Sequence, residues 1–283
     1  MSVRVAVTLG LCLWAGAAQA QTMRPFTTFR QLHGEARLNA RVEYGAGSLR
    51  VEPGQPGELY RMNLSYDEDR FVPVSDFEAS SRTVVLGLRA AGQGGVRVVS
   101  RNQLRQRATI ALSPRADLAL DLSIGAVDAD LELGGLRISD LGLQTGASRA
   151  TVRFSRPNGM RCRHAAFSAG AAEVSVFGLG NSRCEEIEFE GGMGKILLDF
   201  GGVWSSSARV EVKMAMGEIT LRLPRRVGIR LTRTKFLSRF ESAGLLRRGD
   251  SFVSPNYDAA EHRLDLDLTT AMGEVNVEWA EER

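Results

Sequence analysis

Apolar and polar residues alternate in short runs along most of this chain, and small residues interrupt the runs at regular places. The runs AMGEITLRL (residues 215–223) and AMGEVNVEW (residues 271–279) share this pattern, and five further segments match it when Gly217 and Gly273 are aligned as a corner position. Such alternation is typical of half-buried β-strands, so the chain is predicted to be all-β. The seven corner positions are Gly47, Val127, Ser148, Ala172, Gly194, Gly217 and Gly273.

The columns on both sides of the corner agree among the seven copies. Two residues before it every copy has Gly or Ala, one residue before it Ala or Met, and one residue after it a polar residue. Apolar residues stand seven and five positions before the corner and two and four positions after it. Each copy therefore predicts two alternating strands joined by a tight bend, where small residues leave room for the backbone. We expect the Ala/Met column to fill the corner from inside, because Met is a flexible gap-filler.

The spacing of the copies predicts how these units are arranged. Between residues 127 and 217 successive corners are 21, 24, 22 and 23 residues apart. A period of about 22 residues with short strands is typical of a single-stranded parallel β-solenoid, and parallel crossovers favour a right-handed one. We expect this domain to occupy residues 39–283, with residues 21–38 as an N-terminal cap or linker. Residues 234–258 are predicted to form a loop or an elaborated coil.

The first twenty residues, MSVRVAVTLGLCLWAGAAQA, resemble a secretory signal. Arg4 precedes an apolar run, and Ala18-Gln19-Ala20 forms a small-x-small cleavage site before Gln21. No later segment approaches the roughly 20 apolar residues of a membrane span. We therefore expect an exported protein, periplasmic or extracellular, that is cleaved near Ala20 and has no transmembrane span in its mature form.

Charge changes this picture little. The chain has 36 Lys and Arg against 33 Asp and Glu, and loss of Arg4 with the signal leaves the mature chain near neutral. An exported protein seldom meets DNA, so we expect no nucleic-acid partner. Two stretches, residues 79–116 and 222–248, are rich in Arg. They form either an ordinary solvated face or a surface for an anionic envelope polymer or phospholipid headgroups. The arginines of the two stretches that bear on this hypothesis are Arg82, Arg89, Arg97, Arg101, Arg105, Arg107 and Arg115, then Arg222, Arg225, Arg226, Arg230 and Arg233.

The two cysteines of the mature chain, Cys162 and Cys184, are 22 residues apart, which is one repeat period. Residues one period apart lie on adjacent coils about 5 Å from each other, a separation that suits a disulfide. An exported compartment favours its formation. Relative to the preceding corners the two cysteines stand at +14 and +12, so their register is approximate. The alternatives are an inter-coil disulfide and two unpaired thiols.

Catalysis finds little support in the residue pattern. His33, His164 and His262 are scattered, and no glycine-rich loop resembles a phosphate cradle. A cluster of acids suggests calcium or the polysaccharide lyases built on β-helices, but these acids occupy outward positions of alternating strands, where any polar residue serves. We predict no catalytic residue, no cofactor and no metal site. The acids in question are Asp117, Asp121, Asp128 and Asp130.

Several segments resemble a known family. RVEYGAGSLRVEPG (residues 41–54), LYRMNLSYDED (59–69) and LDLSIGAVDADLELGGLRISDLGLQTGASRATVRF (120–154) look like the LiaF-like, cell-wall-active antibiotic response domain, also called a toast-rack domain. The AMGE and GGMGK copies are similar to related adhesin-like β-solenoids. The resemblance implies a non-catalytic protein with an interaction or structural role in the bacterial cell envelope, linked to envelope stress. Its partner would be an unknown envelope protein or an anionic envelope polymer.

LiaF-type regulators usually carry N-terminal membrane helices and act beside a membrane sensor kinase, whereas we expect a signal peptide at the start of this chain. A direct kinase-inhibiting role is therefore not expected from the resemblance. Two alternatives to the envelope role stay open: a carbohydrate-active enzyme on a β-helix and an adhesin-like surface protein.

Overall fold

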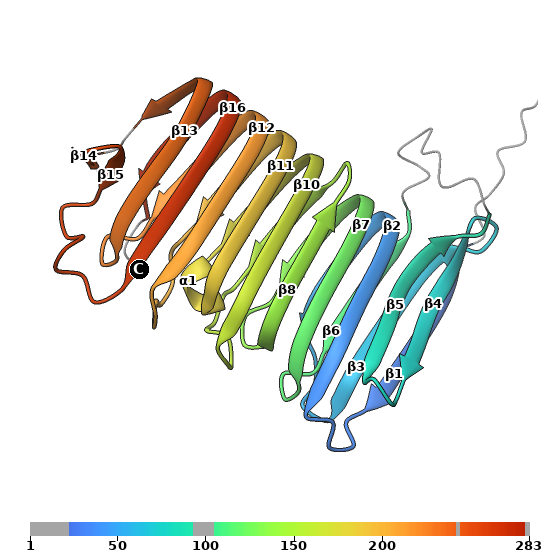
Figure 1. Cartoon of the computed structure of the whole chain (residues 1–283). Coiled ribbons are helices and arrows are strands. Elements are labelled where there is room, and N and C mark those ends of the chain that lie inside the picture. Colours follow the sequence, from blue (N-terminus) through green and yellow to red (C-terminus); the bar gives the residue numbers. More distant parts are fainter. Residues whose placement is uncertain (1–22, 93–104, 242–243, 281–283) are drawn as a thin grey trace, which may run out of the picture.

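The computed structural model describes residues 23–92, 105–241 and 244–280, leaving aside the side chains of residues 235–239 and 241. Sixteen strands form one sheet, and α1 (Leu179–Ser182) is the helix of the described part. The long strands lie side by side along the long axis of the molecule, and each bends back on itself at a corner (Figure 1). The predicted signal peptide at residues 1–20 lies outside the described residues, as do Arg97 and Arg101.

The middle of the molecule is a stack of parallel strands, each of which, with its corner, we call a rung. β8 and β9 together make one rung, since they pair with the two halves of β7 and of β10. The repeat predicts that the corner positions lie opposite one another, and the pairs Ala172↔Gly194 and Gly194↔Gly217 confirm this register. The strands are β7 (Asp117–Glu132), β8 (Arg137–Thr145), β9 (Arg149–Arg153), β10 (Cys162–Phe177), β11 (Cys184–Asp199) and β12 (Ala208–Leu223).

At the C-terminal end the order in space departs from the order in sequence. The last strand, β16 (Arg263–Trp279), pairs in parallel with β12 on one side and with β13 (Gly228–Glu241) on the other. β13 is therefore the outermost long strand, and it is followed by β15 (Ser251–Val253) and β14 (Leu246–Arg248). In the column where β16 has the buried Leu268, β13 has Arg233, whose guanidinium carbon lies 4.3 Å from the ring centre of Phe240. Within the described part of the chain, no further long strand packs against β13, so its inward column can contain a charged residue whose guanidinium stacks on an aromatic ring.

The N-terminal end is built from antiparallel pairs around one shared rung. β2 pairs in parallel with β7 on one side and with β5 and β6 on the other. Residues 23–31, within the predicted cap or linker, form β1, which pairs antiparallel with β3. The strands of this end are β1 (Met23–Gln31), β2 (Arg37–Pro53), β3 (Glu58–Asp67), β4 (Phe71–Glu78), β5 (Thr83–Ala90) and β6 (Arg107–Leu112).

The core runs the length of the stack between the two halves of each bent strand. The apolar columns predicted from the repeat point inward: on β12, Val212, Ile219 and Leu221 are each at most 1 % exposed. Burying one such side chain contributes about 1.5–3 kcal/mol, and the inward residues of all rungs form one continuous cluster. Within the described ranges, no helix has the length and hydrophobicity needed to cross a membrane.

Candidate functional site

A long hollow in the surface follows the row of corners. It has a volume of about 1300 Å³ and is lined by residues of seven successive rungs, from β2 to β16. Six rung spacings of about 4.8 Å make it roughly 29 Å long. We call it the corner groove. Its floor is the small-residue column that precedes each corner by two positions, namely Gly45, Gly125, Gly146, Gly170, Gly192, Ala215 and Ala271.

The corner arises from a change in the phase of the alternation. On β12, Met214 is buried, Ala215 and Met216 are both exposed, and burial resumes at Ile219. Two consecutive outward residues require a special backbone conformation, which Gly217 supplies with φ 136°. A Cβ added to Gly217 would lie 2.0 Å from the carbonyl oxygen of Gly194 on the next rung. The corner glycine is therefore required both for its positive φ and for the close approach of two backbones.

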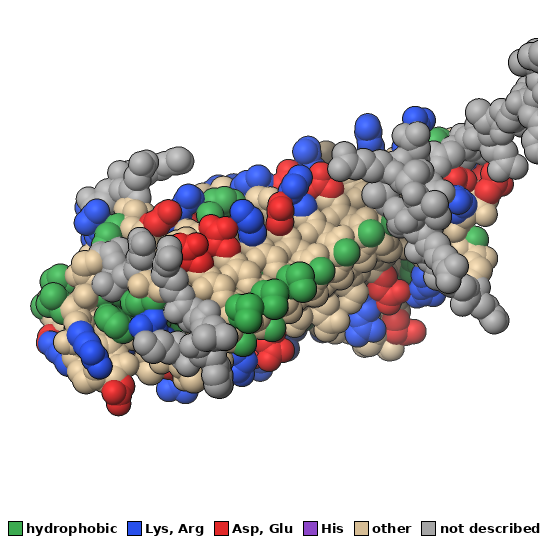
Figure 2. Space-filling model, turned by 90° about the horizontal axis from the view of Figure 1, so that it is seen from above, with side chains coloured by type: hydrophobic (Ala, Val, Ile, Leu, Met, Phe, Trp, Pro, Cys, Tyr) green, Lys and Arg blue, Asp and Glu red, His purple; other side chains and the backbone are tan. Residues whose placement is uncertain are grey.

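The prediction that the Ala/Met column fills the corner from inside holds at Ala46, which is 0 % exposed, but is wrong for the methionines. Met193, Met216 and Met272 are 57 %, 43 % and 46 % exposed. They lie on adjacent rungs and are paired in register, Met193↔Met216 and Met216↔Met272. We call these three residues the methionine ladder. Figure 2 shows a row of hydrophobic side chains running along the molecule beside a strip of backbone.

One wall of the corner groove is the column four residues before each corner. In its middle this wall carries hydroxyl and amide groups: Ser123, Gln144 and Ser168 are exposed on successive rungs. Charged residues stand toward its ends, and they largely neutralise one another. Arg89 donates to Glu43 at 2.9 Å at one end. Toward the other end Lys213 and Glu190 both line the groove, on adjacent rungs.

Neither of the two groove residues with a shifted pKa is suited to act as a general acid or base. A hydrogen bond to Glu211, at 2.7 Å, raises the pKa of Lys213, and the nearby carboxylates add to this effect. Lys213 is thus held as a cation. Burial raises the pKa of the Tyr44 phenol, whose oxygen has no hydrogen-bond partner among the described residues. Neither group is poised to exchange a proton near neutral pH.

The acids that suggested calcium or glycan cleavage are spread over outward positions and paired with arginines. Asp117 accepts from Arg137 at 2.8 Å, and Asp130 is paired with Arg153. Asp121 lies 3.7 Å from Arg41. Asp128 is exposed on the second half of β7. Over the described part of the chain, no group of three or more His, Cys, Asp or Glu is placed to hold a metal ion.

The arginines proposed as an anionic-partner surface lie near the C-terminal end and make separate contacts. Arg222 is paired with Glu278 at 3.0 Å. The guanidinium carbon of Arg230 lies 4.5 Å from the ring centre of Tyr257. Arg225 stacks in the same way over Trp279, at 5.6 Å. Arg233 covers the inward column at the terminal rung, as described above, and Arg226 is exposed. In the first basic stretch, Arg105, Arg107 and Arg115 are exposed, Arg82 has a positive φ, and Arg89 binds Glu43.

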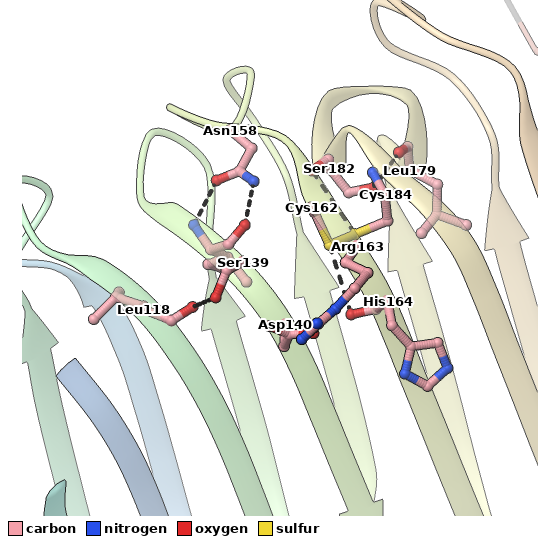
Figure 3. Close-up of a disulfide and its surroundings, with 11 residues drawn as sticks. Leu118, Ser139, Asp140, Asn158, Cys162, Arg163, His164, Leu179, Ser182 and Cys184 are labelled. Atoms are coloured by element: carbon pink, nitrogen blue, oxygen red, sulfur yellow. Dashed lines mark hydrogen bonds and ion pairs between the residues drawn. A yellow bond between two sulfur atoms is a disulfide. The ribbon is translucent and has the colours of Figure 1, made fainter. Parts of the chain in front are cut away.

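Cys162 and Cys184 begin β10 and β11 and are joined by a disulfide, with their Cα atoms 4.2 Å apart (Figure 3). They are direct partners in the parallel register. Counted back from the following corners, Ala172 and Gly194, both stand ten positions away, so the offset expected from the preceding corners reflects only the lengths of the intervening loops. Beside them, Asn158 hydrogen-bonds both the N–H and the C=O of Ile138. These contacts fasten neighbouring rungs to one another.

The residues that sequence reasoning missed are those that form the groove floor. The sequence showed them as a column of Gly and Ala but could not show that this column faces solvent. The repeat also identifies the methionines as a column, but predicts the wrong direction for their side chains. One feature of the sequence bears on both columns: two consecutive positions before each corner have Gly, Ala or Met, and this pair interrupts the strict alternation of apolar and polar residues.

Comparisons with known proteins place the chain in a family. A search of curated proteins found no match. Among solved structures, the chain is similar to a "putative cell adhesion protein" from Clostridium sporogenes, with 15 % identity, a TM-score of 0.48 and coverage of 91 % of this chain and 100 % of that one. It is also similar to a "putative adhesin" from Bacteroides fragilis, with 11 % identity, a TM-score of 0.39 and coverage of 90 % and 97 %.

A "putative lipid binding protein" from Parabacteroides distasonis has 9 % identity, a TM-score of 0.35 and coverage of 91 % and 97 %. These structural likenesses are too distant to assign a function. A family model described as the N-terminal domain of toast_rack, DUF2154, matches residues 19–177, or 159 of the 283 residues. Because this match spans more than half of the chain, and confirms the resemblance found in its motifs, the protein belongs to the toast-rack family.

Proposed function

We propose that the protein is an exported, non-catalytic interaction protein of the bacterial cell envelope, and that the corner groove holds an extended segment of an envelope protein. The observation that carries this proposal is the groove itself, which is open along seven rungs and floored by Gly and Ala. A long shallow groove of this kind fits an extended chain better than a compact small molecule.

The charge of the groove favours a protein segment over an anionic polymer. Its cations and carboxylates are balanced, with Arg89 paired to Glu43 and Lys213 to Glu211. The hydroxyl and amide groups in the middle of the wall can hydrogen-bond a neutral backbone. An anionic polymer at the C-terminal arginines would have to displace Glu278 from Arg222 and Asp265 from near Arg230.

Three features support the rest of the proposal. The disulfide between Cys162 and Cys184 is typical of proteins that fold in an oxidising compartment, which supports export and cleavage near Ala20. The parallel rungs, about 22 residues apart, support a right-handed β-solenoid. The ion-paired, dispersed acids do not favour a glycan-cleaving enzyme. The family resemblance supports including a link to envelope stress in the proposal.

The test places a photo-crosslinking amino acid at Ala215, on the groove floor, in cells treated with an envelope-active antibiotic. Ala215 is exposed and already carries a Cβ, so the change does not strain the corner. The same amino acid at Ala259, exposed outside the groove, is the matched control. We expect one discrete protein adduct from position 215, absent from position 259 and absent when the neighbouring floor residue Ala271 is replaced by Trp.

Equal labelling from both positions, or none from position 215, would refute a groove partner. Capture of a surface glycan in place of a protein would favour the adhesin-like alternative.

A further inference from the structure

The methionine ladder is an unusual use of the protein surface. Met193, Met216 and Met272 are each about half exposed, and a contiguous exposed apolar patch marks an interaction or binding site more often than scattered apolar residues do. In the same column the rungs before β11 have Ala, as at Ala126, Ala147 and Ala171, and the terminal rung β13 has Leu237 in register with Met272. Methionine is thus placed only on three consecutive rungs of the repeat, where its thioethers form a row.

The row has a chemistry that other apolar residues lack. Thioether sulfur is a soft ligand that selects Cu(I) and similar ions, and unlike a thiol it stays available in an oxidising compartment. Both cysteines of the described chain are in the disulfide, so the methionines are its available soft donors. We propose that the methionine ladder binds a soft monovalent metal ion, Cu(I) or Ag(I), through two thioethers of adjacent rungs, with Met216 able to pair with either neighbour.

The spacing of the rungs fits this coordination. Paired residues on neighbouring strands are about 4.8 Å apart, so parallel side chains present their sulfurs at nearly that separation. If the metal–thioether bonds are as long as a zinc–thiolate bond, about 2.3 Å, two sulfurs on one ion lie up to about 4.6 Å apart. The flexible, unbranched Met side chain can close the small remaining difference without moving the backbone.

The charges around the ladder tolerate a cation. The column that follows the corner carries Lys195, Glu218 and Glu274 on the same three rungs. Lys195 is paired with Glu218 at 3.2 Å, and Glu274 is in register with Arg239 of the adjoining strand β13, so positive and negative residues balance along this column. A monovalent ion on the ladder therefore meets no excess of positive charge from the flanking column.

The experiment titrates the purified protein with Ag(I), which does not change oxidation state, in chloride-free buffer. Binding is followed by the ¹³C-methyl resonances of methionine and by competition with a chromophoric chelator, and Cu(I) is titrated under anaerobic conditions in parallel. We expect saturable binding that shifts the three ladder methyls but leaves Met62, which is fully buried, unchanged. Zn²⁺, which prefers nitrogen and thiolate ligands, should not bind at this place.

The decisive variant is M193L/M216L/M272L, which keeps apolar side chains of similar size and removes only the sulfurs. It should lower the affinity for Ag(I) more than about a hundredfold, whereas M160L, a half-buried methionine outside the ladder, should bind as the original protein does. An unchanged unfolding midpoint shows that the triple variant is folded. No saturable binding by the original protein, or equal binding by the triple variant, overturns the proposal. Groove occupancy is a separate property, because leucine preserves an apolar docking face.

Discussion

Replacing Gly217 with alanine tests the account of the corner most directly. A Cβ at this position would lie 2.0 Å from the carbonyl oxygen of Gly194, about 1 Å closer than such contacts allow. The φ of 136° adds a conformation that an L-residue adopts only at a cost of about 1–2 kcal/mol. To relieve this clash, the β11 and β12 rungs must separate locally, which costs about 1–3 kcal/mol, as overpacking does. Together these effects predict a destabilisation of roughly 2–5 kcal/mol.

For a chain of this size the loss corresponds to a fall in Tm of roughly 4–20 °C. Thermal and urea unfolding measure it, and hydrogen exchange should show faster opening of the backbone on both sides of the β11–β12 corner. The matched control is Gly57→Ala, because a Cβ at Gly57 meets no atom within 4 Å. The control should stay within about 0.5 kcal/mol of the original protein. If Gly217→Ala unfolds at the same temperature as Gly57→Ala, the explanation of the corner is wrong.

Three further predictions concern other contacts. Replacing Cys162 and Cys184 together by serine should cost about 3 kcal/mol in urea unfolding under non-reducing conditions, since the bond closes a loop of 22 residues; no change would show that the bond is unformed in solution. The hydrogen bond from Arg61 lowers the pKa of Glu58, so the stability that this contact contributes should be fully present above the ordinary carboxyl pKa and be lost as pH falls through the lowered pKa. Glu58→Gln should therefore reduce the fall in Tm at acid pH, and an unchanged pH–Tm profile would contradict this contribution. Mild peroxide should oxidise the methionine ladder before the buried Met62, as peptide mass mapping would show; equal oxidation would contradict the exposures described.

The register of the stack could be predicted because every copy of the repeat has its apolar residues at the same distances from the corner. Apolar residues at fixed distances from the corner require their rungs to align, since a shift of one residue would turn each inward column outward. Once β16 lies beside β12, the same requirement places Gly217 opposite Gly273, although 56 residues separate the two glycines. The same rule brings Cys162 opposite Cys184.

The direction of the corner side chains could not be predicted from the pattern. Inward residues stand at odd distances before the corner and at even distances after it, so the alternation must change phase somewhere between Met214 and Ile219. The sequence does not say at which residue, and a strict alternation continued from Met214 would have placed Met216 inside. The positive φ of Gly217 places the change of phase at the corner, so that Ala215 and Met216 both face solvent.

The order of the last rungs escaped prediction for a different reason. β13 and β16 carry compatible inward columns, and the segment between them is long enough to return on either side of β13, so the repeat alone permits both orders. Arg233 distinguishes them, because a guanidinium in the inward column can be accommodated only where no further rung must pack against it. A polar residue that breaks an otherwise apolar column thus marks the end of the stack, and the complete apolar column of β16 marks an internal rung. The groove and the methionine ladder lie on these internal rungs, where strands on both sides hold the corners at a constant spacing. That constancy lets side chains distant in sequence form one continuous surface.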